Sequence, residues 1–159
     1  MPSSFLPLFQ WADGSWLSLE IRSSRWQFAV LEMIHLVGLT IFLGSLVLID
    51  LRLFGFGVRG MRPAELARDL WRWSRIGMVT VLGSGVVLFF GEPMKLYGSP
   101  AFFVKMVFLV AAILVQVTLF RQVRSQKANP ESLADTVIGT LLLALWLGVG
   151  LAGRGIGFL

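Results

Sequence analysis

Apolar residues run in four long stretches along the 159-residue chain, separated by short polar segments rich in arginine. A helix rises about 1.5 Å per residue and the hydrocarbon core of a bilayer is roughly 30 Å thick, so about 20 apolar residues cross it. Each stretch reaches that length. The pattern predicts four membrane-spanning helices, near residues 26–54, 71–91, 101–121 and 135–157. The predicted fold class is an all-α integral membrane four-helix bundle over residues 26–159.

The first 25 residues mix apolar and polar positions too closely to form a fifth span. Trp11 and Trp16 stand among leucines and phenylalanines, while Asp13 and Glu20 interrupt the apolar run. Segments of this kind lie flat in the headgroup region, with tryptophans as anchors. We predict an interfacial amphipathic segment over residues 1–25, with a disordered tail as the alternative. We expect no removable signal peptide, because no charged leader precedes the apolar residues.

Composition agrees with a membrane protein and excludes other classes. Hydrophobic residues make up 56% of the chain and charged residues 14%, which is too apolar for an ordinary soluble domain. The net charge of +5 comes from basic residues at the ends of apolar runs, where they meet lipid headgroups, so we expect no nucleic-acid partner. The absence of cysteine excludes disulfides, thiolate metal sites, iron–sulfur clusters and covalently attached haem.

Basic residues are distributed unequally between the two sides of the predicted bundle. Nine lie in the segments that join the first two and the last two spans or at the adjoining ends of those spans: Arg52, Arg59, Arg62, Arg68, Arg72, Arg75, Arg121, Arg124 and Lys127. The positive-inside rule therefore predicts that both termini lie outside the cytoplasm, as does a loop from Glu92 to Pro100. Pro63, followed by helix-forming residues, predicts a helical lead-in to the second span.

Two ionisable residues, Glu32 and His35, lie in the outer third of the first predicted span. A charged side chain within a span costs about 2.5–3.5 kcal/mol even on mild insertion scales, so such residues face a bundle interior, a partner, a cofactor or a proton path. Counting turns from the predicted topology puts Glu92, Lys105 and Arg154 in the same layer. We predict that these five groups converge near the outer face.

Histidine chemistry suggests a function for this layer. A neutral imidazole is a good axial ligand of haem iron, and four-helix bundles hold haem between facing helices. We therefore predict that His35 is the metal ligand of haem b or a related redox cofactor, and that Glu32 orients it. Lys105 and Arg154 would hold the anionic propionates by charge-assisted hydrogen bonds. The predicted role is electron transfer, or that of a small subunit in a membrane redox assembly.

The second axial ligand and the partners are left open. A single histidine supplies one ligand, so six-coordinate haem needs a symmetric dimer, a partner subunit or a methionine. The methionines available are Met33, Met78, Met94 and Met106. Further cations for a propionate are Arg22 and Arg25. The predicted partners are the lipid bilayer and either copies of this chain or a larger complex; no catalytic residue is predicted, and enzymatic activity stays open.

Three other interpretations compete with the haem hypothesis. The polar layer can serve helix packing alone, with Glu32 paired to Arg154 or Lys105 in an accessory or scaffold subunit. Glu32 and His35 also have the Glu-x-x-His spacing of di-iron carboxylate bundles, although it occurs once here. In a proton-linked transporter or a quinone-binding protein the same pair would relay protons.

A second polar layer lies on the cytoplasmic side. Asp50 is near the predicted membrane boundary, where we expect it to pair with Arg52, Arg75 or Arg121 and so join the first two helices. Small residues at four-residue spacing predict close contacts between helices. These are Ala144, Gly148 and Ala152 in the fourth span, and Thr40 and Gly44 in the first.

Several stretches together resemble an uncharacterised bacterial family of four-span membrane proteins over nearly the whole chain. They are Glu32-x-x-His35-x-x-Gly38, Asp50-Leu51-Arg52-Leu53-Phe54-Gly55, Lys105 and Trp146-x-Gly148-x-x-x-Ala152-Gly153-Arg154. The resemblance implies a bacterial inner membrane. More distantly, the positions of His35 and Lys105 are similar to those of a histidine and a lysine in HemJ-type protoporphyrinogen oxidases and CopD-type membrane domains. In the HemJ type that pair is associated with haem b, which implies the same role here.

Overall fold

The computed structural model describes residues 3–54, 56, 63–124 and 133–156. Its elements are the short 3₁₀ helix η1 (Ser3–Phe5) and the α-helices α1 (Leu6–Asp13), α2 (Trp16–Ser23), α3 (Arg25–Leu53), α4 (Pro63–Gly91), α5 (Pro93–Gly98), α6 (Pro100–Arg124) and α7 (Leu133–Gly155). The described part of the chain contains no strand. The predicted all-α fold is therefore confirmed.

Four helices contain segments long and apolar enough to cross a membrane. These segments are Trp26–Arg52 in α3, Glu65–Gly91 in α4, Pro100–Thr118 in α6 and Val137–Gly155 in α7. Each overlaps one of the predicted spans, as expected for a membrane protein with a helical bundle. The predicted lead-in to the second span is present as the first turns of α4, which is continuous from Pro63 because proline is tolerated at a helix start.

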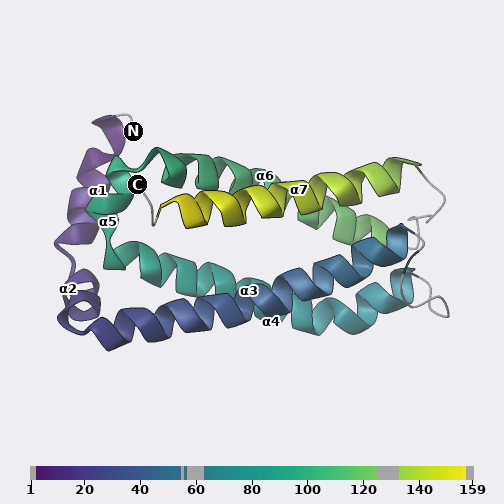
Figure 1. Cartoon of the computed structure of the whole chain (residues 1–159), viewed down its shortest axis with the longest axis horizontal. Coiled ribbons are helices and arrows are strands. Elements are labelled where there is room, and N and C mark those ends of the chain that lie inside the picture. The colour runs from purple at the N-terminus through teal and green to yellow at the C-terminus, as the bar shows by residue number, and fades with distance from the viewer. Residues whose placement is uncertain (1–2, 55, 57–62, 125–132, 157–159) are drawn as a thin grey trace.

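The long helices form two antiparallel pairs, α3 with α4 and α6 with α7 (Figure 1). Contacts between the pairs are sparser and join α3 to α7 and α4 to α6. The short helices α1, α2 and α5 lie across one end of the long helices, which we call the capped end (Figure 1). The opposite end, where the chain passes from α3 to α4 and from α6 to α7, is called the loop end.

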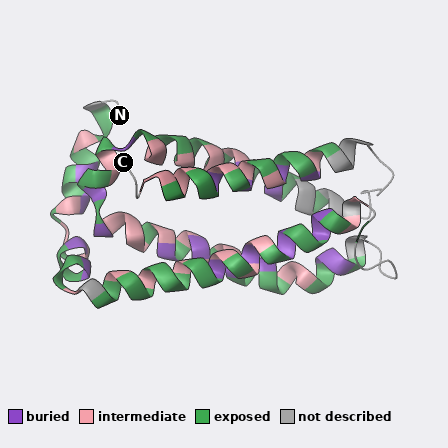
Figure 2. Cartoon of the chain, in the orientation of Figure 1, coloured by how far each residue is buried: buried purple, intermediate pink, exposed green. Residues whose placement is uncertain are grey.

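Buried apolar residues lie between the two pairs, from the middle of the bundle toward the loop end (Figure 2). The largest are Phe42 and Leu46 of α3 and Leu142 and Trp146 of α7, none more than 3% exposed. Phe42 meets Trp146 edge-on with ring centroids 4.6 Å apart, an arrangement that adds about 0.5–1.5 kcal/mol beyond the area buried. Toward the capped end, by contrast, α6 before Ala112 and the described part of α7 after Val149 contain no buried residue.

Glycines allow the backbones of α3 and α4 to approach closely. A Cβ atom on Gly77 would lie 2.6 Å from the backbone nitrogen of Phe42 and 2.9 Å from the carbonyl oxygen of Gly38. These neighbours are backbone atoms, so no side-chain rotation would relieve the overlap. The row predicted at Thr40 and Gly44 does not make such a contact, because Thr40 is exposed and Gly44 has open space around it.

The predicted small-residue row of the fourth span packs within the second pair. A Cβ atom on Gly148 would lie 3.1 Å from the ring of Phe108 on α6. Ala144, one turn earlier, is exposed. Only part of the row is therefore used for close packing of α6 against α7.

The capped end is closed by packed side chains. Phe9 of α1 is 5% exposed, and its ring lies 5.2 to 6.1 Å, centroid to centroid, from those of Phe89, Tyr97 and Phe102. The guanidinium of Arg22 on α2 donates to the carboxylate of Asp13 at 2.6 Å, which ties α2 to α1. Exposed tryptophans remain on this end of the molecule: Trp11, Trp16 and Trp26.

The connection between α4 and α6 differs from the predicted loop. Residues Pro93–Gly98 form the helix α5, with Pro93 at its first position, where a missing N–H costs nothing. The carboxylate of Glu92 lies 3.1 Å from the ammonium of Lys95, three residues later. The short connection predicted from Glu92 to Pro100 is therefore helical over Pro93–Gly98.

We expect the substitution Gly77→Ala to lower the free energy of unfolding by about 1–3 kcal/mol, because the added methyl group forces α3 and α4 apart. Thermal unfolding of the purified protein in detergent measures the effect. Gly83→Ala, in the same helix but with nothing within 4 Å of the added Cβ, is the matched control and should be neutral or slightly stabilising. Equal effects of the two substitutions would contradict the close approach described here.

Candidate functional site

His35 of α3 is half-buried against α4, toward the capped end. Its Nδ1 atom lies 2.9 Å from the hydroxyl oxygen of Ser84. The same hydroxyl donates to the backbone carbonyl of Thr80 in its own helix. Since a hydroxyl has one proton, the ring N–H at Nδ1 is the donor in the contact with Ser84. The Nε2 atom of the neutral imidazole then keeps its lone pair for a proton or a metal ion.

The packing of α3 on α4 explains why Ser84 lies opposite this imidazole. The close approach at Gly38 and Gly77 fixes how the two antiparallel helices are aligned along their length. Gly85 also contacts the ring: a Cβ atom there would lie 3.4 Å from Cε1 of His35. The imidazole is thus held on one side by a hydrogen bond and lies directly against the backbone of α4.

Two charged residues act on the same imidazole. Both Lys105 of α6 and Glu32 of α3 interact electrostatically with His35. The half-buried side chain of Lys105 runs along α7, where a Cβ atom on Gly153 would lie 3.6 Å from both Cε and Nζ. Glu32, one turn before His35, is exposed and forms no salt bridge with Lys105 in the described structure. The direct contacts of the imidazole are therefore with α4, whereas Lys105 of α6 lies against α7 at Gly153.

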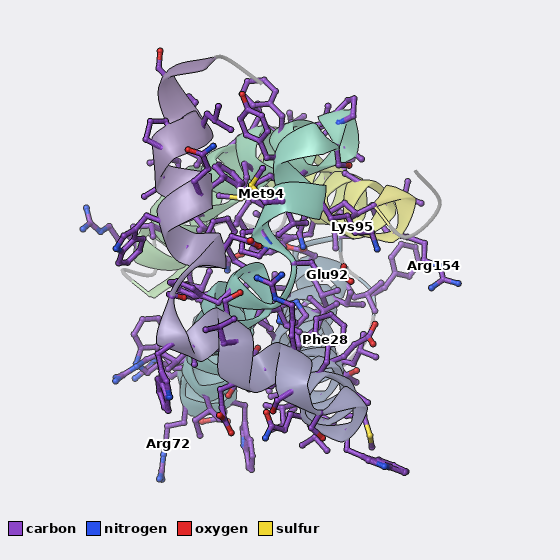
Figure 3. The ribbon with its side chains drawn as sticks, turned by 90° about the vertical axis from the view of Figure 1, so that its left-hand side faces the viewer. Phe28, Arg72, Glu92, Met94, Lys95 and Arg154 are labelled. Atoms are coloured by element: carbon purple, nitrogen blue, oxygen red, sulfur yellow. The ribbon has the colours of Figure 1, made fainter. Side chains whose placement is uncertain are left out.

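Other members of the predicted layer are placed differently. Glu92 is paired with Lys95, and both lie near the middle of the capped end (Figure 3). Arg154 is exposed and extends to the side of that end (Figure 3), although it follows Gly153, which Lys105 contacts. Arg22 is bound within the cap, and the side chain of Arg25 lies outside the described residues.

The described residues show no cluster for a bare metal ion. They contain no group of three or more histidine, cysteine, aspartate or glutamate side chains that could hold one. Met78 packs against the core, whereas the other candidate methionines are largely exposed: Met33 at 65%, Met94 at 40% and Met106 at 39%.

Asp50 is the largest departure from the predicted pairing. It is fully buried, and neither carboxylate oxygen has a hydrogen-bond partner among the described residues. The side chain faces α7, since a Cβ atom on Gly139 would lie 3.2 Å from Oδ1. The predicted pairing with Arg52, Arg75 or Arg121 was wrong. The rotation of α3 about its axis turns Asp50 into the bundle, whereas Arg75 lies over a tryptophan ring of α4 and Arg121 is exposed.

Two polar residues of the structure were not predicted. Ser84 positions the imidazole, and Gln116 of α6, only 3% exposed, accepts a hydrogen bond from the indole N–H of Trp146 at 3.3 Å. The signal available in the sequence was the same for both, namely a lone polar residue inside an apolar span. Their partners depend on how neighbouring helices are aligned, which the sequence pattern does not contain.

The fold and the site define a membrane helical bundle of two helix pairs with one imidazole near its capped end. A family model matches residues 8–159, and the chain belongs to this family, DUF6644, a family of unknown function. The predicted resemblance to an uncharacterised family is thereby confirmed, whereas the similarity to HemJ-type and CopD-type proteins is not shown. No curated protein and no solved structure matches the chain.

We expect Asp50→Asn to raise the thermal unfolding midpoint. An amide is less costly to bury than a carboxylate, and replacing an uncompensated buried ionisable group is often neutral or stabilising, by about 1–4 kcal/mol for apolar replacements. Ser45→Ala, in the same helix, is the control for changing a buried polar residue of the core. The hydroxyl of Ser45 donates to the backbone carbonyl of Ile41 in its own helix, so its loss should change the midpoint little. A lower midpoint for Asp50→Asn would show that the carboxylate has a partner.

Proposed function

We propose that this protein binds haem b or a related redox cofactor through His35 and serves in electron transfer, or as a small subunit of a membrane redox assembly. The observation that carries the proposal is the orientation of the imidazole. Nδ1 donates to Ser84, so Nε2 is the nitrogen left for a metal. Histidine ligands of metals almost always donate their other ring N–H to a fixed acceptor, and a neutral histidine is a common axial ligand of haem iron.

The chemistry of the surrounding residues fits such a group. Lys105 is half-buried and lies along α7 at Gly153, and its ammonium group can pair with a propionate. The capped-end halves of α6 and α7 contain no buried residue in their described parts, so packing there is loose compared with the core. Gly85 adds no side chain beside the ring.

Each residue then has a defined task. His35 would coordinate the iron, Ser84 would fix the ring orientation, and Lys105 would neutralise a propionate. Glu32 would adjust the basicity of the imidazole through its charge. The bound haem would supply one-electron transfer, which these side chains do not provide by themselves.

We also propose that the loop end faces the cytoplasm in a bacterial inner membrane, which places both termini outside. Arginine side chains on the exposed surface near this end support the orientation: Arg68, Arg72, Arg75 and Arg121. The exposed tryptophans of the capped end would then lie in the outer headgroup region.

Purified protein from cells supplied with a haem precursor should show a Soret band that shifts on reduction with dithionite. His35→Ala should abolish it, and added imidazole should restore part of it. Ser84→Ala should weaken haem retention by about 10–100-fold, because loss of such supporting hydrogen bonds has that effect on metal affinity. Absorption spectra normalised to protein concentration give the measurement.

Thr40→Ala is the control for the haem experiment. Thr40 is exposed on the same helix, and its hydroxyl donates to the backbone carbonyl of Leu36, one turn earlier in that helix. Its spectrum should equal that of the unmodified protein. A protein without a Soret band, or one whose band survives in His35→Ala, would overturn the haem proposal. Loss of stability without any spectral change would instead favour an accessory subunit.

The proposed orientation predicts the behaviour of reporter fusions at the C-terminus. Alkaline phosphatase, which is active only outside the cytoplasm, should be active there, whereas a fluorescent protein that requires the cytoplasm should be dark. Fusions made after Arg124, in the connection from α6 to α7, should give the opposite result, with an inactive phosphatase and a bright fluorescent protein. A bright cytoplasmic reporter at the C-terminus would reverse the assignment.

A further inference from the structure

Asp50 is a fully buried acidic residue in the last turn of α3, and the proposed haem site does not use it. Neither of its carboxylate oxygens has a hydrogen-bond partner among the described residues. Burying an ionised carboxylate is very costly unless a cation or several hydrogen-bond donors compensate its charge. The carboxyl group therefore needs a ligand that removes this charge.

The surroundings of the carboxyl group are apolar. A Cβ atom on Gly139 of α7 would lie 3.2 Å from Oδ1 of Asp50 and 3.8 Å from Cε1 of Phe54. The carboxyl group and the phenyl ring thus lie against the same point of the α7 backbone. Leu46, one turn earlier on α3, and the adjacent Ile49 are buried members of the core.

The charged side chains near this end of the neighbouring helices lie on the outer surface. Those described are exposed: Glu65, Arg68, Asp69 and Arg72 of α4, and Arg121 of α6. The charged residue among the described side chains of α7, Arg154, is at the opposite end of the bundle. Arg52 follows Asp50 by two residues, about 200° around the helix, and does not bond the carboxylate. No described cation therefore compensates Asp50.

The residues around Asp50 do not supply a coordination shell for a metal cation. Hard cations such as Ca²⁺ and Mg²⁺ take about six or more oxygen ligands. Here one carboxylate faces apolar side chains, and the described residues contain no group of three or more acidic or histidine side chains. A proton, by contrast, needs a single oxygen atom.

We propose that Asp50 is a proton-binding site in the core of the bundle. Its carboxyl group holds a proton at neutral pH and exchanges it with water at the loop end, where α3 finishes within one turn. Toward the capped end the buried side chains of Leu46, Phe42 and Trp146 separate it from the imidazole. The site goes beyond the proposed function and does not depend on haem.

Infrared spectroscopy of the full-length protein tests the assignment, because a neutral carboxyl group has a C=O stretching band that a carboxylate lacks. The protein is measured in a detergent without ester groups, which would absorb in the same region. We expect the band at neutral pH, with a shift in D₂O and in protein made with carbon-13-labelled aspartate. Asp50→Asn and Asp50→Leu should each remove it, whereas Asp69→Asn, an exposed aspartate at the same end, should keep it.

The pH dependence of unfolding gives a second readout. Above about pH 5 an aspartate in an unfolded chain is ionised, so a folded state that keeps the proton loses stability as the pH rises. Relative to Asp50→Asn, the unfolding equilibrium constant of the unmodified protein should increase about tenfold per pH unit until the folded protein releases the proton. Asp69→Asn should retain the dependence of the unmodified protein.

Absence of the aspartate C=O band at neutral pH would overturn the proposal and would assign Asp50 a cationic partner outside the described residues. Loss of the band when sodium or potassium chloride is added at constant pH would also overturn it, in favour of a metal cation. Equal pH dependence of Asp50→Asn and the unmodified protein would count against it in the same way. The isotope shift is measured on the unmodified protein, so the result does not require either Asp50 variant to fold.

Discussion

The backbone contact between α3 and α4 at Gly38, Phe42 and Gly77 is the constraint on which the site depends. Because a Cβ atom at Gly77 would overlap backbone atoms, the two helices can approach this closely only where glycine occurs. The contact fixes the alignment of the pair, and that alignment brings Ser84 to the imidazole of His35. The orientation of the one histidine in the chain therefore follows from the absence of a side chain two turns away.

The two halves of the bundle have different physical characters. In the half nearer the loop end, Phe42, Leu142 and Trp146 bury apolar surface and hold the two helix pairs together. In the other half, the described parts of α6 and α7 bury no side chain, and the groups around His35 are only partly covered. Stability is thus concentrated away from the imidazole, and the loosely packed half is where a ligand can be accommodated with the least loss of core packing.

The sequence predicted the long helices well because apolar length is a strong signal. The continuous α4 was also foreseen, since Pro63 suits a helix start. His35 and Glu32 were selected because an ionisable group in a span needs an explanation. The sequence did not predict side-chain contacts that depend on how each helix is rotated about its axis and aligned along its neighbours. Asp50 turns inward toward Gly139, and Ser84 and Gln116 find partners on other helices, none of which a one-dimensional pattern specifies.

The order of the helices along the chain has a consequence for assembly. Each tightly packed pair consists of consecutive helices, so most contacts within a pair join residues that leave the ribosome close together in time. Such local contacts close with a small loss of chain entropy. The first hairpin, with the Ser84–imidazole bond inside it, can therefore be complete before the second has been synthesised. The core between the two pairs then forms last, when the two completed hairpins dock against each other.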